Sequence, residues 1–159
     1  TGIIGMDSAL LDRRMETTPN NTVLLADGDV IVRLALGEYL RACGLTVLEA
    51  ATGDEAKAIL QSGMSIDSLF CDAQLPGTEN GFALAQWVRR YRPAIDVVLT
   101  TSLESKTEAA GRFCAPDGKG HSDLAGLSAR IRAMQAERQR RARPPSSTKT
   151  IPAKRRRLT

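Results

Sequence analysis

The sequence predicts an α/β fold, a doubly wound, five-stranded parallel sheet with helices on both faces. Short apolar runs with β-branched residues alternate with stretches of helical periodicity about five times, which is the pattern of strand–helix units in a parallel sheet. Several of these runs end abruptly on a polar residue, as buried strands that enter a loop do. In such sheets, ligands bind at the carboxyl ends of the strands, near the switch point.

The elements up to residue 100 follow clear patterns. Each expected strand is a short run of apolar residues, and each expected helix has apolar side chains three or four positions apart. In chain order, we expect a strand at 22–27, a helix at 30–43, a strand at 46–50, a helix at 54–61, a strand at 68–71, a helix at 82–91 and a strand at 96–100. The first, third and fourth strands lead to Asp27, Asp72 and Thr100, so we expect these side chains at one edge of the sheet.

The pattern after residue 100 is weaker. Residues 102–111 predict a short polar helix, and residues 112–115 predict a poor fifth strand. Residues 124–139 predict a better helix, because Leu127, Ile131 and Met134 are in helical register.

The length and charge of the chain predict one domain with tails. The 159 residues carry a net charge of +4, which divides unevenly: residues 137–159 contain nine Lys or Arg and one acid, hence +8, and the rest carries −4. We expect a flexible N-terminal segment at 1–20, one domain at 21–136 and a basic, disordered tail at 137–159. No run has the roughly 18 apolar residues that span a bilayer, and no secretory signal is visible. A cytoplasmic protein without a membrane span is therefore expected.

The cysteines predict neither a disulfide framework nor a zinc site. Cys43, Cys71 and Cys114 are an odd number without a CxxC pair, and the chain has one histidine. We expect three reduced thiols inside a cytoplasmic fold.

Four short motifs stand at the ends of the expected strands. They are VLLADGD at 23–29, FCDAQLPG at 70–77 with NG at 80–81, VVLTT at 97–101 and DGKG at 117–120. In this order and spacing, they resemble the receiver domain of two-component response regulators, which has the flavodoxin-like fold of the chemotaxis protein CheY. The resemblance covers residues 21–136 and implies a signalling domain, not an enzyme.

The resemblance implies a role for each polar residue at this edge of the sheet. Asp72 would be the phosphoacceptor, which takes a phosphoryl group from a histidine kinase or phosphotransfer protein. Thr100 would bond the phosphorylated product, and Lys119 would pair with the phosphoryl oxygens. A Mg²⁺ ion would bind Asp27, Asp72 and the backbone carbonyl of Gln74.

Each of these residues also has a purely structural interpretation. Asp72 fits any loop that follows a strand, Thr100 fits a strand, and Lys119 fits a glycine-rich surface loop. Asp27 fits the N-terminal end of a helix, where the helix dipole favours a carboxylate.

The sequence departs from the family pattern near the metal and near the lysine. The family has two adjacent acids after its first strand, but the second position here is Gly28, and Asp29 replaces the lost ligand only if the backbone bends. We therefore expect a weakened Mg²⁺ site. Lys119 is followed by Gly120 where the family has proline, and Phe113 is the only aromatic residue near the position of the family's switch aromatic.

These observations leave three functions open. The first is a phosphorylated receiver that changes its affinity for a downstream protein partner, with a homodimer as one arrangement. The second, suggested by Gly28, is a pseudo-receiver, a binding module with weak or no phosphorylation. The third is binding of nucleic acid or an acidic partner through Arg140, Arg141, Arg143 and residues 154–157 of the tail. A solvated tail that keeps an acidic domain in solution accounts for the same charges.

Overall fold

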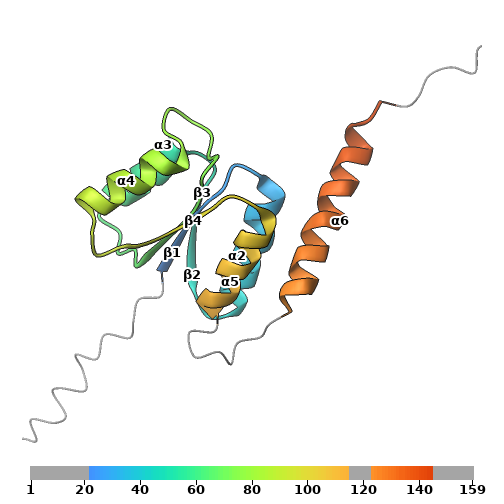
Figure 1. The fold of residues 1–159 in the computed structure, drawn as a ribbon, viewed down its shortest axis with the longest axis horizontal. Helices are drawn as coiled ribbons and strands as arrows, with labels where there is room; N and C mark the ends of the chain where they lie inside the picture. The colour runs from blue at the N-terminus through green and yellow to red at the C-terminus, as the bar shows by residue number, and fades with distance from the viewer. Residues whose placement is uncertain (1–21, 115–122, 145–159) are drawn as a thin grey trace, which may run out of the picture.

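A computed structural model describes residues 22–114 and 123–144 (Figure 1). Its elements are, in chain order, β1 (Thr22–Ala26), α2 (Val30–Ala42), β2 (Thr46–Ala50), α3 (Gly53–Gln61), β3 (Ser68–Asp72), α4 (Gly81–Tyr91), β4 (Asp96–Thr100), α5 (Leu103–Cys114) and α6 (Leu124–Ala142). Up to residue 100, the ends of these elements agree with the sequence predictions to within one residue. The segment 1–20, expected to be flexible, lies outside the described residues.

The four strands form one parallel sheet in the order β2-β1-β3-β4. The central strands β1 and β3 pair so that Ala26 lies opposite Cys71, and β3 and β4 pair so that Asp72 lies opposite Thr100. Because the strands are parallel, their carboxyl ends meet at one edge of the sheet, as expected.

Helices cover both faces of the sheet (Figure 1). On one face, α3 and α4 pack over a core that includes the fully buried Leu69, Leu84 and Val88. On the other face, α2 and α5 pack over a second core that includes Leu25 and Phe70, and α6 lies against both of these helices. The alternation of inward side chains along β1 and β3 thus supplies both cores.

The predicted fifth strand is wrong for the residues that the structure describes. Residues 112–114 form the end of α5, so the described sheet has four strands and β4 lies at its edge. A helical spacing explains the difference: Leu103, Thr107 and Ala110 stand three or four positions apart on the side of α5 that faces the core. The polar residues between them concealed this pattern in the sequence.

The last helix is longer than expected. α6 ends at Ala142, three residues beyond the predicted end at 139, so it extends into the segment from residue 137 for which a disordered tail is expected. Glu137 forms ion pairs with Arg140 and Arg141, three and four residues further on, and such pairs stabilise a helix. The rest of the tail, from residue 145 onward, is not among the described residues. In the part that is described, no helix is long and apolar enough to cross a membrane.

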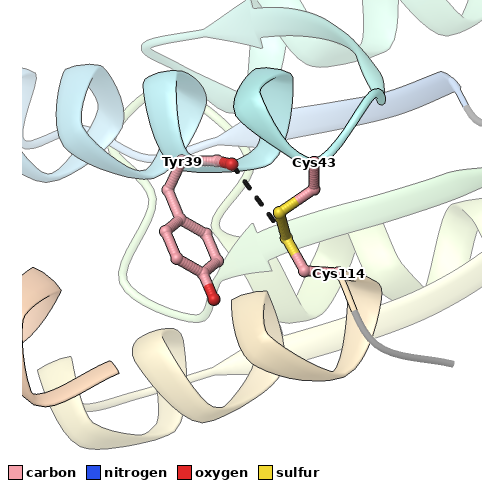
Figure 2. Close-up of a disulfide and its surroundings, with 3 residues drawn as sticks. All are labelled: Tyr39, Cys43 and Cys114. Carbon is pink, nitrogen blue, oxygen red and sulfur yellow. Dashed lines mark hydrogen bonds between the residues drawn. A yellow bond between two sulfur atoms is a disulfide. The ribbon is translucent and has the colours of Figure 1, made fainter. Parts of the chain in front are cut away.

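The expectation of three reduced thiols is also wrong, because Cys43 and Cys114 form a disulfide (Figure 2). Cys43 caps the C-terminal end of α2, and Cys114 is the last residue of α5. The two helices pack against each other, and their ends meet although 71 residues separate the cysteines in the sequence. Spacing along the chain could not reveal this pair, since it depends on which helix ends meet. Cys71 is a buried free thiol.

Candidate functional site

Three of the predicted site residues lie together where β1, β3 and β4 end. Asp27 directly follows β1, Asp72 is the last residue of β3, and Thr100 is the last residue of β4. The side chain of Asp27 is 1% exposed, whereas that of Asp72 is 15% exposed. Of these two carboxylates, that of Asp72 is therefore the one that a molecule in solution can reach.

A lysine from α5 joins the two carboxylates. The Nζ atom of Lys106 lies 2.7 Å from Oδ2 of Asp27 and 2.9 Å from Oδ2 of Asp72. The lysine side chain is only 9% exposed. A buried ammonium group is tolerated only when it is paired, so these three side chains form one interdependent cluster.

The cluster shifts the pKa values of its members. Burial raises the pKa of Asp27, although Lys106 and a backbone hydrogen bond from Asp29 oppose the shift. Burial by itself would lower the pKa of Lys106, but the hydrogen bonds and charges of Asp27 and Asp72 outweigh it, so this pKa is raised. Burial, aided by the two aspartates, also raises the pKa of the neighbouring Cys71 thiol to about 12. Lys106 is therefore charged at neutral pH and the thiol of Cys71 is not ionised.

Asp29 does not take the place of the missing acid at position 28. It is the N-cap of α2, where its Oδ1 accepts hydrogen bonds from the backbone N–H groups of Ile31 and Val32. Its Oδ2 accepts a hydrogen bond from the side-chain amide of Gln135 on α6, at 3.1 Å. Burial opposes its ionisation, but these hydrogen bonds outweigh burial and lower the pKa of Asp29. Both carboxylate oxygens are thus engaged away from Asp72.

The space beside Gly28 is filled by a proline ring. A Cβ atom at position 28 would lie 2.6 Å from Cδ and 2.9 Å from Cγ of Pro76. Contacts this short require one of the groups to move, and a proline ring cannot rotate away as a flexible side chain can. Asp27, Asp72, Lys106 and the residues packed around them are called the pocket below. Beside Gly28, this pocket is packed for a residue without a side chain where the family has its second acid.

The surroundings of Asp72 supply two donors to its carboxylate. The backbone N–H of Gln74 donates to Oδ1 at 2.9 Å, and Lys106 contacts Oδ2. Thr100 is a buried residue, and its hydroxyl donates instead to the carbonyl oxygen of Cys71 at 3.3 Å. Among the other predicted site residues, Lys119 lies outside the described residues.

Comparison with known proteins gives the family of the chain. The response regulator receiver domain family matches residues 23–116, which is more than half of the chain. The chain belongs to the response-regulator receiver family. A curated relative, the cyclic di-GMP phosphodiesterase of Thermotoga maritima, is 30% identical over 83 residues, which cover 52% of this chain and 22% of that protein. The receiver thus spans about a fifth of that relative's length.

Several solved structures resemble this receiver. A response regulator receiver protein from Pseudomonas putida is 27% identical, with a TM-score of 0.44, and the match covers 57% of this chain and 78% of that one. The chemotaxis protein CheY4 from Vibrio cholerae is 26% identical, with a TM-score of 0.46, and the match covers 57% and 79% of the two chains.

Receiver domains typically bind Mg²⁺, but the described residues of this receiver do not fit that ion well. Of the predicted ligands, the structure brings the carboxylates of Asp27 and Asp72 together and directs Asp29 elsewhere. The Gln74 backbone contacts Asp72 through its N–H group, whereas the predicted ligand was its carbonyl oxygen. The described ranges contain no group of three or more His, Cys, Asp or Glu side chains arranged to hold a metal. The two carboxylates that remain already share the ammonium group of Lys106.

Sequence reasoning missed Lys106 and named Lys119 instead, which lies outside the described residues and stays a prediction. A signal was nevertheless present in the sequence. Lys106 follows Leu103 by three positions and precedes Ala110 by four, so it stands on the apolar side of a helix that begins just after Thr100. Lysine is seldom buried on such a face unless it is paired with an acid.

Proposed function

We propose that this receiver accepts a phosphoryl group on Asp72 from a phosphohistidine of a histidine kinase or phosphotransfer protein. The single observation that supports this most is the setting of Asp72. Asp72 is the last residue of the central strand β3, and its side chain is partly exposed. Its carboxylate lies 2.9 Å from the ammonium group of Lys106. Asp27, in contrast, is too deeply buried to meet a partner's phosphoryl group.

In the proposed step, a carboxylate oxygen of Asp72 forms a bond to phosphorus while the bond from phosphorus to the imidazole nitrogen breaks. The nitrogen keeps the bonding electron pair and takes a proton from water. Negative charge gathers on the phosphoryl oxygens, and the ammonium group of Lys106 is placed to offset it.

The signal would then pass through Thr100 and α5. Thr100 stands opposite Asp72 on the neighbouring strand, and its hydroxyl can exchange the long bond to Cys71 for a bond to a phosphoryl oxygen. The ammonium group of Lys106 would turn toward the phosphoryl oxygens, which changes its contacts with Asp27 and Asp72 at the start of α5. Both changes bias the population of two arrangements of the surface around β4 and α5, which a downstream protein can distinguish.

The direct test uses a small phosphodonor such as acetyl phosphate, with and without Mg²⁺, followed by intact mass measurement. We expect one phosphoryl adduct on the unmodified chain and none on Asp72→Ala. Asp96→Ala is the matched control, because Asp96 is an exposed aspartate at the opposite end of β4, and this variant should be modified normally. An adduct that persists in Asp72→Ala, or no adduct under any condition, contradicts the proposal.

The second candidate is a pseudo-receiver that binds a partner without being phosphorylated. The observation that favours it is the filled pocket, in which Lys106 pairs with both carboxylates and Pro76 blocks the position of the second acid. In this case the phosphodonor gives no adduct, and Asp72→Asn binds the partner as tightly as the unmodified chain does. A phosphoryl adduct confined to Asp72 contradicts this second candidate.

A further inference from the structure

We propose that Lys106 is the resident cation of this pocket and takes the place of the divalent metal ion. The charges of Asp27 and Asp72 are then offset by an ammonium group that belongs to the chain itself. This inference rests on the proposed function only where it concerns phosphorylation, because the occupancy of the pocket can be measured without that reaction.

The position of the ammonium group is the first argument. Its Nζ atom is within hydrogen-bond distance of Oδ2 of both Asp27 and Asp72. Besides this ion pair, Oδ2 of Asp27 has no hydrogen-bond partner in the described part of the chain. A divalent ion that bridged the same two oxygens would have to displace Nζ, since two cations cannot share that point. Metal and lysine therefore compete for one place.

The ligand set is the second argument. Two carboxylates and one ammonium group leave the pocket with a single net negative charge, and hard divalent cations depend on the number of carboxylate ligands for their affinity. The side of the pocket at Gly28 is closed by Pro76, and Asp29 is engaged in capping α2. Neither position 28 nor Asp29 can therefore supply the missing oxygen ligand unless the loop that contains both residues rearranges.

The way in which α5 is anchored is the third argument. Lys106 lies near the start of the helix, where its backbone N–H donates to the carbonyl oxygen of Ser102 at 3.0 Å. Ala109 and Ala110, one turn later, are buried in the core, and Cys114 ties the far end of the helix to α2. These contacts thus hold the ammonium group in position before any anion binds, and electrostatic stabilisation requires such prior orientation.

The experiment measures Mn²⁺ binding by the unmodified chain, Lys106→Met and the matched control Lys57→Met. Mn²⁺ serves as the probe because its paramagnetism broadens the amide signals of nearby residues in ¹H–¹⁵N spectra. Lys57 is a suitable control, since it forms an ion pair with Glu79 at 2.7 Å but stands on α3, outside the pocket. Lys106→Gln is a second variant, which removes the charge while it keeps a hydrogen-bond donor.

We expect the unmodified chain and Lys57→Met to bind Mn²⁺ more weakly than about 1 mM. Removal of the adjacent positive charge should strengthen binding at least about tenfold in Lys106→Met and Lys106→Gln, with broadening centred on residues 72–74. Binding by the unmodified chain well below 1 mM overturns the proposal. So does an unchanged affinity in a folded Lys106 variant, and if neither variant folds, the unmodified chain decides.

Phosphorylation in the presence of EDTA separates this inference from the proposed function. Equal labelling of Asp72 with EDTA and with Mg²⁺ supports Lys106 as the resident cation, and an absolute requirement for Mg²⁺ overturns it. If Asp72 is not labelled under either condition, the proposed function fails, and the Mn²⁺ measurements still decide whether Lys106 holds the place of the metal.

Discussion

The described part of the chain has two regions that are stabilised by different kinds of contacts. The first region is residues 22–100, and the second consists of the described residues that follow them. In the first region, strands alternate with helices, and each element follows from its own local pattern of apolar residues. In the second region, α5 and α6 carry polar and charged residues around most of their surface and are held by contacts from distant parts of the chain. These contacts include the disulfide to Cys43, the ion pairs of Lys106 and the packing of Ile131 against the core.

The pocket lies where the two regions meet, and each supplies one sign of its charge. Asp27 and Asp72 come from the regular region, whereas the cation comes from α5 in the second region. Disruption of long-range contacts in the second region is therefore expected to change the geometry of the pocket.

Loss of the disulfide is expected to have the largest effect on stability. The bond closes a loop of 71 residues, so its removal should lower the free energy of unfolding by about 4 kcal/mol. Urea unfolding with and without reductant measures this change. Cys114→Ser should lose the same stability and no longer respond to reductant, whereas Cys71→Ser should respond as the unmodified chain does. Identical unfolding curves with and without reductant would show that α5 is held by packing alone.

Removal of the pocket cation is expected to have the next largest effect. Lys106→Met leaves the buried Asp27 without a partner charge, which should lower the free energy of unfolding by about 3 kcal/mol. Lys57→Met breaks an ion pair whose two side chains are 27% and 33% exposed, and should lower it by less than about 1 kcal/mol. Chemical unfolding at neutral pH measures both variants. Equal losses of unfolding free energy would mean that the ion pairs of Lys106 stabilise the fold no more than a surface ion pair does.

A matched pair of isoleucines compares the packing of the two faces. Ile131 on α6 is 0% exposed, and Ile66, before β3, is 9% exposed in the core beneath α3 and α4. Ile→Val at either site should lower the free energy of unfolding by about 1 kcal/mol, because each removes one buried methylene group. Thermal unfolding measures the change. If Ile131→Val has no effect while Ile66→Val does, α6 is only loosely attached.

The smallest expected effect is the pH dependence that arises from Asp54 in the regular region. Hydrogen bonds from the side chain and backbone of Thr78 hold the pKa of Asp54 below its usual value of about 4. Because the pKa of Asp54 is lower in the folded state than in the unfolded state, its ionised carboxylate stabilises the fold at pH values above its unfolded-state pKa. This stabilisation is lost as the pH falls through the folded-state pKa. Asp54→Asn should therefore show a shallower loss of Tm below about pH 4 than the unmodified chain. Parallel profiles would show that this contact adds no stability.

The sequence was a good guide where the chemistry depends on local pattern. The strands that end at Asp27, Asp72 and Thr100 could be located from apolar runs, and the rule for parallel sheets placed the three residues at one edge. The fifth strand failed because residues 112–114 complete a helical face that becomes visible only when α2 is in place beside it. The role of Lys106 was not predicted either, because a lysine is expected to be exposed unless the carboxylates that pair with it are known.

By itself, the sequence determined the alternation of strands and helices, the family and the acidic side of the pocket. These follow from the periodicity of apolar residues and from short motifs, both of which are local properties of the chain. Only the tertiary structure decided the number of strands in the described sheet, the disulfide partners and the origin of the cation beside Asp72. Each of these depends on which distant segments meet, because a charge or a thiol acquires its partner only when the packed helices bring the two groups within bonding distance.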